Sequence, residues 1–128
     1  MSNFKFSERS EMNLKGVNLD LIALARHALM LSAVDFAVID GLRTLEEEKK
    51  MVANGKSQTL NSRHLTGHAI DVLAYLGAQS SWDPPLYAEI NKGFRQASIA
   101  LNIPYAWGGD WKTLKDYGHF ELARSKYP

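Results

Sequence analysis

Short, apolar, β-rich segments are mixed irregularly with helical patterns along this chain, and this order limits the folds open to it. The segment "DFAVID", residues 35–40, suits a buried strand, and "HAIDVLAYL", residues 68–76, suits a central one. Two further short strand candidates follow, "YAWGG" at residues 105–109 and "GHFEL" at residues 118–122. No regular βαβ alternation joins them, so the sequence predicts a small α+β domain and not a doubly wound sheet.

Three segments are predicted to be helices, the first of them because its apolar residues recur at helical spacing. Their start signals differ: a polar N-cap, a capping box in which Thr44 is followed three residues later by Glu47, and a pair of prolines. The predicted helices cover residues 18–31 with Asn18 or Asp20 as N-cap, residues 45–54 ended by Gly55, and residues 86–102 after Pro84 and Pro85. The polar segment between the second helix and the central strand, residues 55–67, is predicted to be a loop.

A chain of 128 residues with 45% hydrophobic and 23% charged residues can bury one core, and we expect a single domain over residues 1–128. The net charge of +1, without a basic block or acidic tail, gives no electrostatic reason to expect nucleic-acid or anionic membrane binding. Residues 1–16 do not resemble a secretory signal, and no run of about 18 apolar residues could span a bilayer. We therefore expect no membrane insertion and a protein that stays in the cytoplasm until it is released.

The segment "SRHLTGHAID", residues 62–71, holds two histidines and an aspartate and raises the question of a metal site. The sequence has no cysteine, so a metal would be held by histidine, aspartate or glutamate. In a strand, Asp71 and His68 point to opposite faces, and they cannot easily bind the same ion. Leu65 stands where an H-E-x-x-H site needs glutamate, which excludes that kind of zinc site.

His64, Asp71 and a distant third residue remain as candidate ligands, which suits the three protein ligands and one open position of a hydrolytic zinc site. His119 is the natural third ligand, because alternation in "GHFEL" places it with Glu121 on one face of the strand. Asp116, three residues earlier, is a carboxylate suited to act as a general base beside such a centre. From the residues alone, a metal site and an ordinary histidine–aspartate pair both stay open.

These residues resemble the signatures of the zinc D,D-carboxypeptidase and L-alanyl-D-glutamate peptidase family. Residues 62–71 match the pattern S-x-H-x-x-G-x-A-x-D, and "DYGH", residues 116–119, matches the second signature, D-x-x-H. "GLRT", residues 41–44, is similar to the element G-[YL]-R-[ST], and "WGGDW", residues 107–111, resembles the segment before the last ligand in the phage endolysin branch. Four elements occur in the right order at compatible spacings, and the resemblance covers residues 4–119.

The resemblance implies a fold like that of the D,D-peptidases and the N-terminal domains of hedgehog proteins. In this fold helices flank an antiparallel sheet in one small α+β domain, so that residues 1–128 would form a single zinc peptidase catalytic domain. It also implies a zinc ion held by His64, Asp71 and His119. Zinc polarises a scissile carbonyl and lowers the pKa of bound water towards about 7, which is the chemistry that peptide hydrolysis needs.

The resemblance assigns further roles within the site. Asp116 is the catalytic base that accepts a proton from the attacking water, and Arg43 holds the substrate or its tetrahedral intermediate through a permanently charged, planar group. Ser62 supports the site from behind or contacts the substrate. Trp107 and Trp111 line the substrate groove.

Some of these residues have a second interpretation. Arg43 could instead form a structural salt bridge with a helix carboxylate such as Glu47, and Trp107 and Trp111 could be packing residues only. Glu48 departs from the family pattern, in which many members carry glutamine at that position. An acid in the cleft would disfavour an anionic ligand, so Glu48 either faces solvent or alters the substrate preference.

The endolysin branch implies an enzyme that hydrolyses the L-alanyl-D-glutamate bond of peptidoglycan stem peptides and causes lysis of a bacterial host. Such an enzyme is expected to be a monomer that waits in the host cytoplasm until a holin opens the inner membrane and then reaches the periplasm and cell wall. One alternative is a D,D-carboxypeptidase or D,D-dipeptidase that acts on D-Ala-D-Ala. The other is a non-catalytic, zinc-stabilised module that binds the cell wall.

Overall fold

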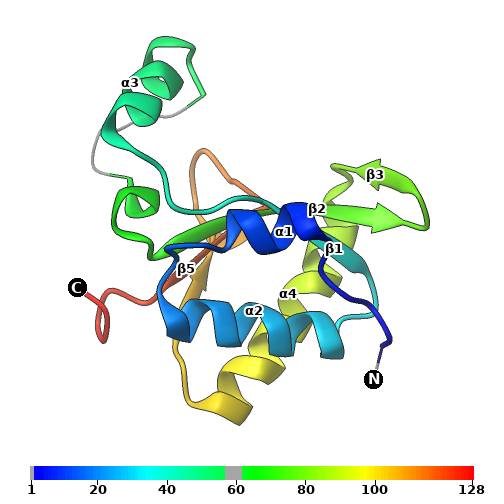
Figure 1. The fold of residues 1–128 in the computed structure, drawn as a ribbon. Helices are drawn as coiled ribbons and strands as arrows, with labels where there is room; N and C mark the ends of the chain where they lie inside the picture. Colours follow the sequence, from blue (N-terminus) through cyan, green and yellow to red (C-terminus); the bar gives the residue numbers. More distant parts are fainter. Residues whose placement is uncertain (1, 57–61) are drawn as a thin grey trace.

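The computed structural model describes residues 2–56 and 62–128 and builds them around one antiparallel sheet (Figure 1). The strand order is β1-β2-β5-β4, and β3 pairs with the C-terminal end of β2. The strands are β1 Asp35–Asp40, β2 Ala69–Leu76, β3 Gln79–Ser81, β4 Tyr105–Trp107 and β5 His119–Leu122. Every one of these pairings is antiparallel, which confirms the predicted α+β architecture.

Two long helices pack against one another and cover one face of the sheet (Figure 1). The helix α2, Leu19–Leu31, begins at Asn18, whose side chain accepts a hydrogen bond from the Asp20 backbone. The helix α4, Pro84–Leu101, opens with its two prolines. Both helices begin where the sequence predicted. In the described part of the chain, no helix combines the length and apolar character needed to cross a membrane.

The core lies between these helices and the sheet, and Phe94 of α4 is at its centre. The Phe94 ring lies 4.0 Å from the ring of Phe120 on β5 and 5.7 Å from the ring of Phe36 on β1, measured between centroids. All three side chains are essentially inaccessible to water. This aromatic cluster links the helical layer to both β1 and β5.

Replacing Phe94 with alanine is expected to lower the free energy of unfolding by about 3–5 kcal/mol, because it removes buried apolar area and leaves a cavity. Urea denaturation of the two proteins measures the difference. Ile99→Ala on the same helix is the matched control, since Ile99 is 77% exposed and its loss should cost about 0.5 kcal/mol or less. Equal costs for the two variants would contradict the central position of Phe94.

A short helix near the N-terminus, α1 Glu8–Asn13, was not predicted from the sequence. It lies along β1, where Ser10 Oγ accepts a hydrogen bond from the Val38 backbone N–H (3.0 Å) and Asn13 Nδ2 donates to the Val38 carbonyl (2.9 Å). These two bonds satisfy polar groups on the outer edge of the sheet, which would otherwise be open to pairing. These contacts with β1 hold the helix in place. They are long-range, so no local sequence pattern predicts them.

The strand β3 was also missed. Its sequence, "QSS", carries no apolar alternation, and the strand follows a turn in which Gly77, at φ 62°, brings the chain back onto β2. A positive φ of this kind is easily adopted by glycine.

The helix α3, Leu45–Ala53, stands away from the sheet (Figure 1). The predicted capping box between Thr44 and Glu47 is present at its start. Within this helix, Glu48 is the buried residue. Beyond α3, part of the predicted loop, residues 57–61, lies outside the described residues. The loop prediction is wrong for Arg63–Thr66, which form the short 3-10 helix η1.

Candidate metal centre and catalytic cleft

Asp71 and His119 lie directly opposite each other in the sheet. The register of β2 against β5 pairs these two residues and pairs Ile70 with Phe120 one step along. Because Ile70 and Phe120 point into the core, alternation places the aspartate and the histidine on the face away from the helices. His119 Nδ1 lies 3.2 Å from Asp71 Oδ1. The sheet itself therefore brings together two residues that are 48 positions apart.

His64 reaches the same place from η1. Ser62 caps this short helix, and its Oγ accepts a hydrogen bond from the His64 backbone (3.2 Å). Gly67 ends it at φ 73°, in close contact with the backbone of Gly16, where an added Cβ would lie 2.9 Å from the carbonyl oxygen. The serine and the glycine of the signature thus both have a local structural reason: they shape the turn that presents His64.

The ligand atoms of His64, Asp71 and His119 all lie within 4.8 Å of one another. His64 Nε2 is 3.3 Å from Asp71 Oδ2. On the outer side of each ring, His64 Nδ1 lies 2.9 Å from the Gly41 carbonyl oxygen and His119 Nε2 lies 2.8 Å from Glu121 Oε1. Protons on these outer nitrogens leave the lone pairs of the inner nitrogens aimed at the centre. This donor set fits zinc, which prefers imidazole nitrogen and carboxylate oxygen in a three-ligand open site.

The charges in this group depend strongly on one another. Burial acts to lower the pKa of His119, but its hydrogen bonds to Asp71 and Glu121 outweigh this and raise it to about 9. Burial acts to raise the pKa of Asp71, but the bonds from His119 and His64 hold it well below its usual range. Without a metal, a proton therefore balances the carboxylates, and a divalent cation would take its place.

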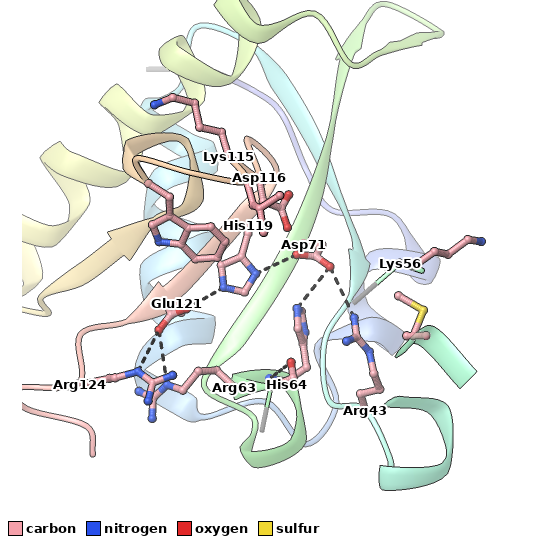
Figure 2. Close-up of a pocket in the computed structure, with 14 residues that line it drawn as sticks. Arg43, Lys56, Arg63, His64, Asp71, Lys115, Asp116, His119, Glu121 and Arg124 are labelled. Atoms are coloured by element: carbon pink, nitrogen blue, oxygen red, sulfur yellow. Dashed lines mark hydrogen bonds and ion pairs between the residues drawn. The ribbon is translucent and has the colours of Figure 1, made fainter. Parts of the chain in front are cut away.

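Asp116 lines the cleft beside these residues (Figure 2). Its backbone is fixed on both sides: the Asp116 N–H donates to the Gly108 carbonyl, and its own carbonyl accepts from the His119 N–H. Glycine is needed at position 108, because an added Cβ would lie 2.2 Å from the Asp116 carbonyl oxygen. Burial, and then the charge of Asp71, raise the pKa of the Asp116 carboxyl above its ordinary value. A carboxylate with raised proton affinity suits a general base.

The cleft has a volume of about 450 Å³ and is lined by residues from distant parts of the sequence. Trp111 lines it, with its ring centroid 5.1 Å from that of His119. Trp107 is not among the residues that line it. Its ring stacks on Phe120, and its Nε1 donates to the Tyr117 carbonyl (2.7 Å), so Trp107 is placed as a packing residue. The two tryptophans of the "WGGDW" segment thus have different surroundings.

Residues 1–126 match the family model described as phage L-alanyl-D-glutamate peptidase. This chain belongs to that family. The L-alanyl-D-glutamate peptidase of Escherichia phage T5 is 37% identical over 129 residues, which cover 98% of this chain and 93% of the phage protein. The L-alanyl-D-glutamate peptidase of Listeria phage A118 is 28% identical over 130 residues, which cover 99% of this chain and 45% of that longer protein.

A solved structure extends the comparison to the fold. The L-Ala D-Glu endopeptidase ChiX of Serratia marcescens is 46% identical and superposes with a TM-score of 0.91, covering 98% of this chain and 96% of that one. The predicted fold class, a small α+β unit with an antiparallel sheet flanked by helices, is therefore confirmed.

Glu48, the departure from the family's usual glutamine, is a partner of Arg43. Its side chain is completely buried, so the expectation that it could face solvent is wrong. Arg43 Nη1 donates to Glu48 Oε1 (2.7 Å), and Nη2 pairs with Asp40 and lies 3.7 Å from Asp71 Oδ2. The alternative prediction of a salt bridge between Arg43 and a helix carboxylate is confirmed, but the partner is Glu48 and not Glu47, which is occupied in the capping box. Arg43 is thus held by two carboxylates behind Asp71.

Replacing Glu48 with alanine is expected to lower the free energy of unfolding by about 3 kcal/mol, because it leaves the buried Arg43 guanidinium with one partner fewer. Glu48→Gln keeps an oxygen acceptor and should cost about 1 kcal/mol. Glu46→Ala, at an exposed position of the same helix, is the matched control. Urea denaturation separates the three, and a cost for Glu48→Ala no larger than that of the control would disprove the anchoring role.

Two features of the centre were not assigned from the sequence. Asp40, at the end of β1, pairs with Arg43, and Glu121 bonds His119. Strand alternation does place Glu121 on the face of His119, which is a usable signal for such a contact. For Asp40 no comparable signal exists, because its pairing depends on the irregular register between Val38 and Asp40 in β1. His68, by contrast, bonds Thr66 and lies outside the ligand group, as strand alternation predicted.

Proposed function

We propose that this chain is a zinc-dependent peptidase that hydrolyses the L-alanyl-D-glutamate bond of peptidoglycan stem peptides. The bond is supported by the family to which the chain belongs and by the activities that name its relatives. One observation supports the metal-dependent chemistry. Two histidine nitrogens and a carboxylate lie within 4.8 Å of one another, and the other ring nitrogen of each histidine is hydrogen-bonded. We assign His64, Asp71 and His119 as the zinc ligands.

The reaction divides between the cofactor and the protein. Zinc, when bound, supplies a Lewis acid that polarises the scissile carbonyl and lowers the pKa of water. Asp116 accepts the proton of the attacking water and later delivers it to the amine of the leaving D-glutamate. This role is supported by its place in the cleft and by its raised pKa.

Arg43 and Ser62 act close to the ligands. Arg43 lines the cleft with its guanidinium beside Asp71, where a permanent positive charge holds that carboxylate and favours a developing oxyanion. Ser62 lines the cleft and supports the turn that carries His64. Trp111 forms an apolar wall for the peptide. Trp107, for which the sequence left a groove role and a packing role open, is left out because it does not line the cleft.

The substrate's charge agrees with the cleft's lining. The exposed side chains of Lys56, Lys115 and Arg124 line it, together with the buried Arg43 and Arg63. A stem peptide carries free carboxylates, and exposed basic side chains around a concave site attract such a ligand and raise its rate of encounter.

The deciding experiment is hydrolysis of purified Gram-negative peptidoglycan by the zinc-loaded protein, with and without a chelator. Mass spectrometry and N-terminal labelling identify the products. Chelator-sensitive release of peptides that begin with D-glutamate is the expected result. Release of terminal D-alanine would instead make the protein a D,D-carboxypeptidase, and bound zinc without cleavage would make it a wall-binding module.

The biological role we propose is that of a phage lysis enzyme. The monomeric enzyme accumulates in the host cytoplasm and reaches the periplasm and cell wall only after a holin opens the inner membrane. The phage family model and the nearly full-length match to the T5 peptidase support this role. Expression in a Gram-negative host with and without a holin tests it: lysis should require the holin, and lysis by the enzyme alone would refute this route.

A further inference from the structure

Glu121 occupies the outer side of His119, facing away from Asp71 (Figure 2). Its Oε1 lies 2.8 Å from His119 Nε2, whereas His119 Nδ1 lies 3.2 Å from Asp71 Oδ1. The Glu121 side chain is only 11% exposed. The imidazole is therefore held between two carboxylates, one on each nitrogen.

The two carboxylates have different positions relative to the proposed ligand group. Asp71 belongs to it, and Glu121 does not. A neutral imidazole carries one proton, and the nitrogen that faces a buried acceptor keeps that proton. With Glu121 accepting from Nε2–H, the lone pair of Nδ1 must point at the centre. Carboxylates behind metal-binding histidines fix the ring and its tautomer in this way.

Glu121 is in turn held by Arg63. The guanidinium Nε of Arg63 lies 3.6 Å from Glu121 Oε2, and its Nη2 donates to the carbonyls of Leu122 (3.1 Å) and Tyr127 (2.6 Å). Arg63 is buried, and within the described residues its Nε makes no hydrogen bond. The Glu121 carboxylate is the charged group that this nitrogen faces. Arg124, a more exposed residue, lies 3.9 Å from the same oxygen.

This arrangement joins the two histidines through their neighbours. Arg63 directly precedes His64 on η1, and Glu121 follows His119 by two residues on β5. The ion pair between Arg63 and Glu121 therefore connects the turn that carries one histidine with the strand that carries the other. The distance between the histidines is constrained on the outer side as well as through Asp71.

We propose that Glu121 is a positioning residue for the metal centre: it holds His119 with Nδ1 facing the zinc and is itself held by Arg63. This inference rests on the ligand set of the proposed function. It assigns to Glu121 no contact with zinc or substrate. Its effect is on metal affinity and on the geometry of the ligand field.

The test compares zinc affinity among the parent, Glu121→Gln and Glu121→Ala, measured by competition with a chromophoric chelator. Glutamine keeps an oxygen that accepts from Nε2–H, so its affinity should stay within about threefold of the parent. Alanine removes the acceptor and should weaken binding by about 10–100-fold. The visible absorption of the cobalt-substituted proteins reports ligand geometry, and it should change for alanine and be restored by glutamine.

Glu89→Ala is the control, because Glu89 is a half-exposed residue of α4 whose ion-pair partner is Lys92, and this variant should match the parent in both measurements. Circular dichroism checks folding. If Glu121→Ala does not fold, Glu121→Asp replaces it, because the shorter side chain keeps the charge and cannot reach Nε2. Parent-like affinity and cobalt spectrum in the folded alanine or aspartate variant would overturn the inference, as would a glutamine variant as weak as alanine.

Zinc binding and peptide cleavage by the parent protein distinguish a failure of this inference from a failure of the proposed function. If the parent binds zinc but does not cleave the L-alanyl-D-glutamate bond, the proposed reaction fails while the affinity series still decides the role of Glu121. If the parent binds no zinc, the ligand assignment and the role of Glu121 are both overturned.

Discussion

Replacing Asp116 with asparagine is expected to lower kcat for stem-peptide hydrolysis by about 10²–10⁴-fold, the usual contribution of a general base. Asparagine has nearly the same shape as aspartate but cannot accept the proton of the attacking water. Because Asp116 is not a proposed ligand, the zinc content should stay at the parent level. Product release followed by chromatography measures the rate, and elemental analysis measures the zinc.

The same substitution should stabilise the metal-free protein at neutral pH. Burial and the charge of Asp71 raise the pKa of Asp116 in the folded state above its unfolded value. The stability linked to its proton is therefore complete below about pH 4 and is lost as the pH rises through the folded pKa. Asparagine does not ionise and avoids this loss, so its melting temperature in chelator should equal or exceed the parent's at pH 7.

Asp110→Asn is the matched control for this experiment, because Asp110 is an exposed residue of the same C-terminal region and does not line the cleft. It should keep parent activity. If Asp116→Asn also kept parent activity, Asp116 could not be the base. If it lost zinc together with activity, Asp116 would have to be counted among the ligands.

Replacing Asp71 with asparagine is expected to abolish both zinc binding and hydrolysis. Asp71 is the only carboxylate in the proposed ligand group, and the neutral amide that replaces it is a poor ligand for zinc. Zinc added to the parent should raise its melting temperature, because the folded state binds the ion preferentially, whereas zinc should leave the variant's melting temperature unchanged. Calorimetry with and without zinc measures this difference.

In chelator, the effect of Asp71→Asn on stability should be opposite to that of Asp116→Asn. The bonds from His119 and His64 hold the folded pKa of Asp71 below its unfolded value, even though burial acts to raise it. Its contribution to stability is therefore present above about pH 4 and is lost as the pH falls towards the folded pKa. The variant should melt below the parent at pH 7, and the gap should narrow in acid.

These two substitutions replace the same residue type in one cleft, so each serves as a control for the other. Stability changes of the same sign at pH 7 would contradict the electrostatic account of the site. Retained zinc binding in Asp71→Asn would contradict the ligand assignment while leaving the role of Asp116 open to its own test.

Much of the centre could be predicted because strand alternation and signature spacing are local properties. Strand alternation over residues 68–73 predicted that Asp71 and His68 point apart. In the structure β2 begins at Ala69, directly after His68, and His68 lies outside the ligand group that contains Asp71. The capping box at Thr44 and the polar cap at Asn18 located two helices, because capping depends on residues within one turn. The ion-pair partners of Arg43 were harder to predict from the sequence. Glu47 and Glu48 are adjacent, and only the packed structure shows which of the two side chains is buried.

By itself, the sequence determined the α+β class, the main helices and strands, the candidate ligands and the strand faces on which Asp71 and His119 lie. Only the tertiary structure decided that Asp71 pairs in register with His119, that Glu48 and Asp40 hold Arg43, that Glu121 lies behind His119, and that Trp111 lines the cleft while Trp107 packs on Phe120. The physical reason is the range of the interactions. Periodicity and capping depend on neighbours within a few residues, whereas register, burial and ion pairing depend on segments that meet only when the whole chain has packed.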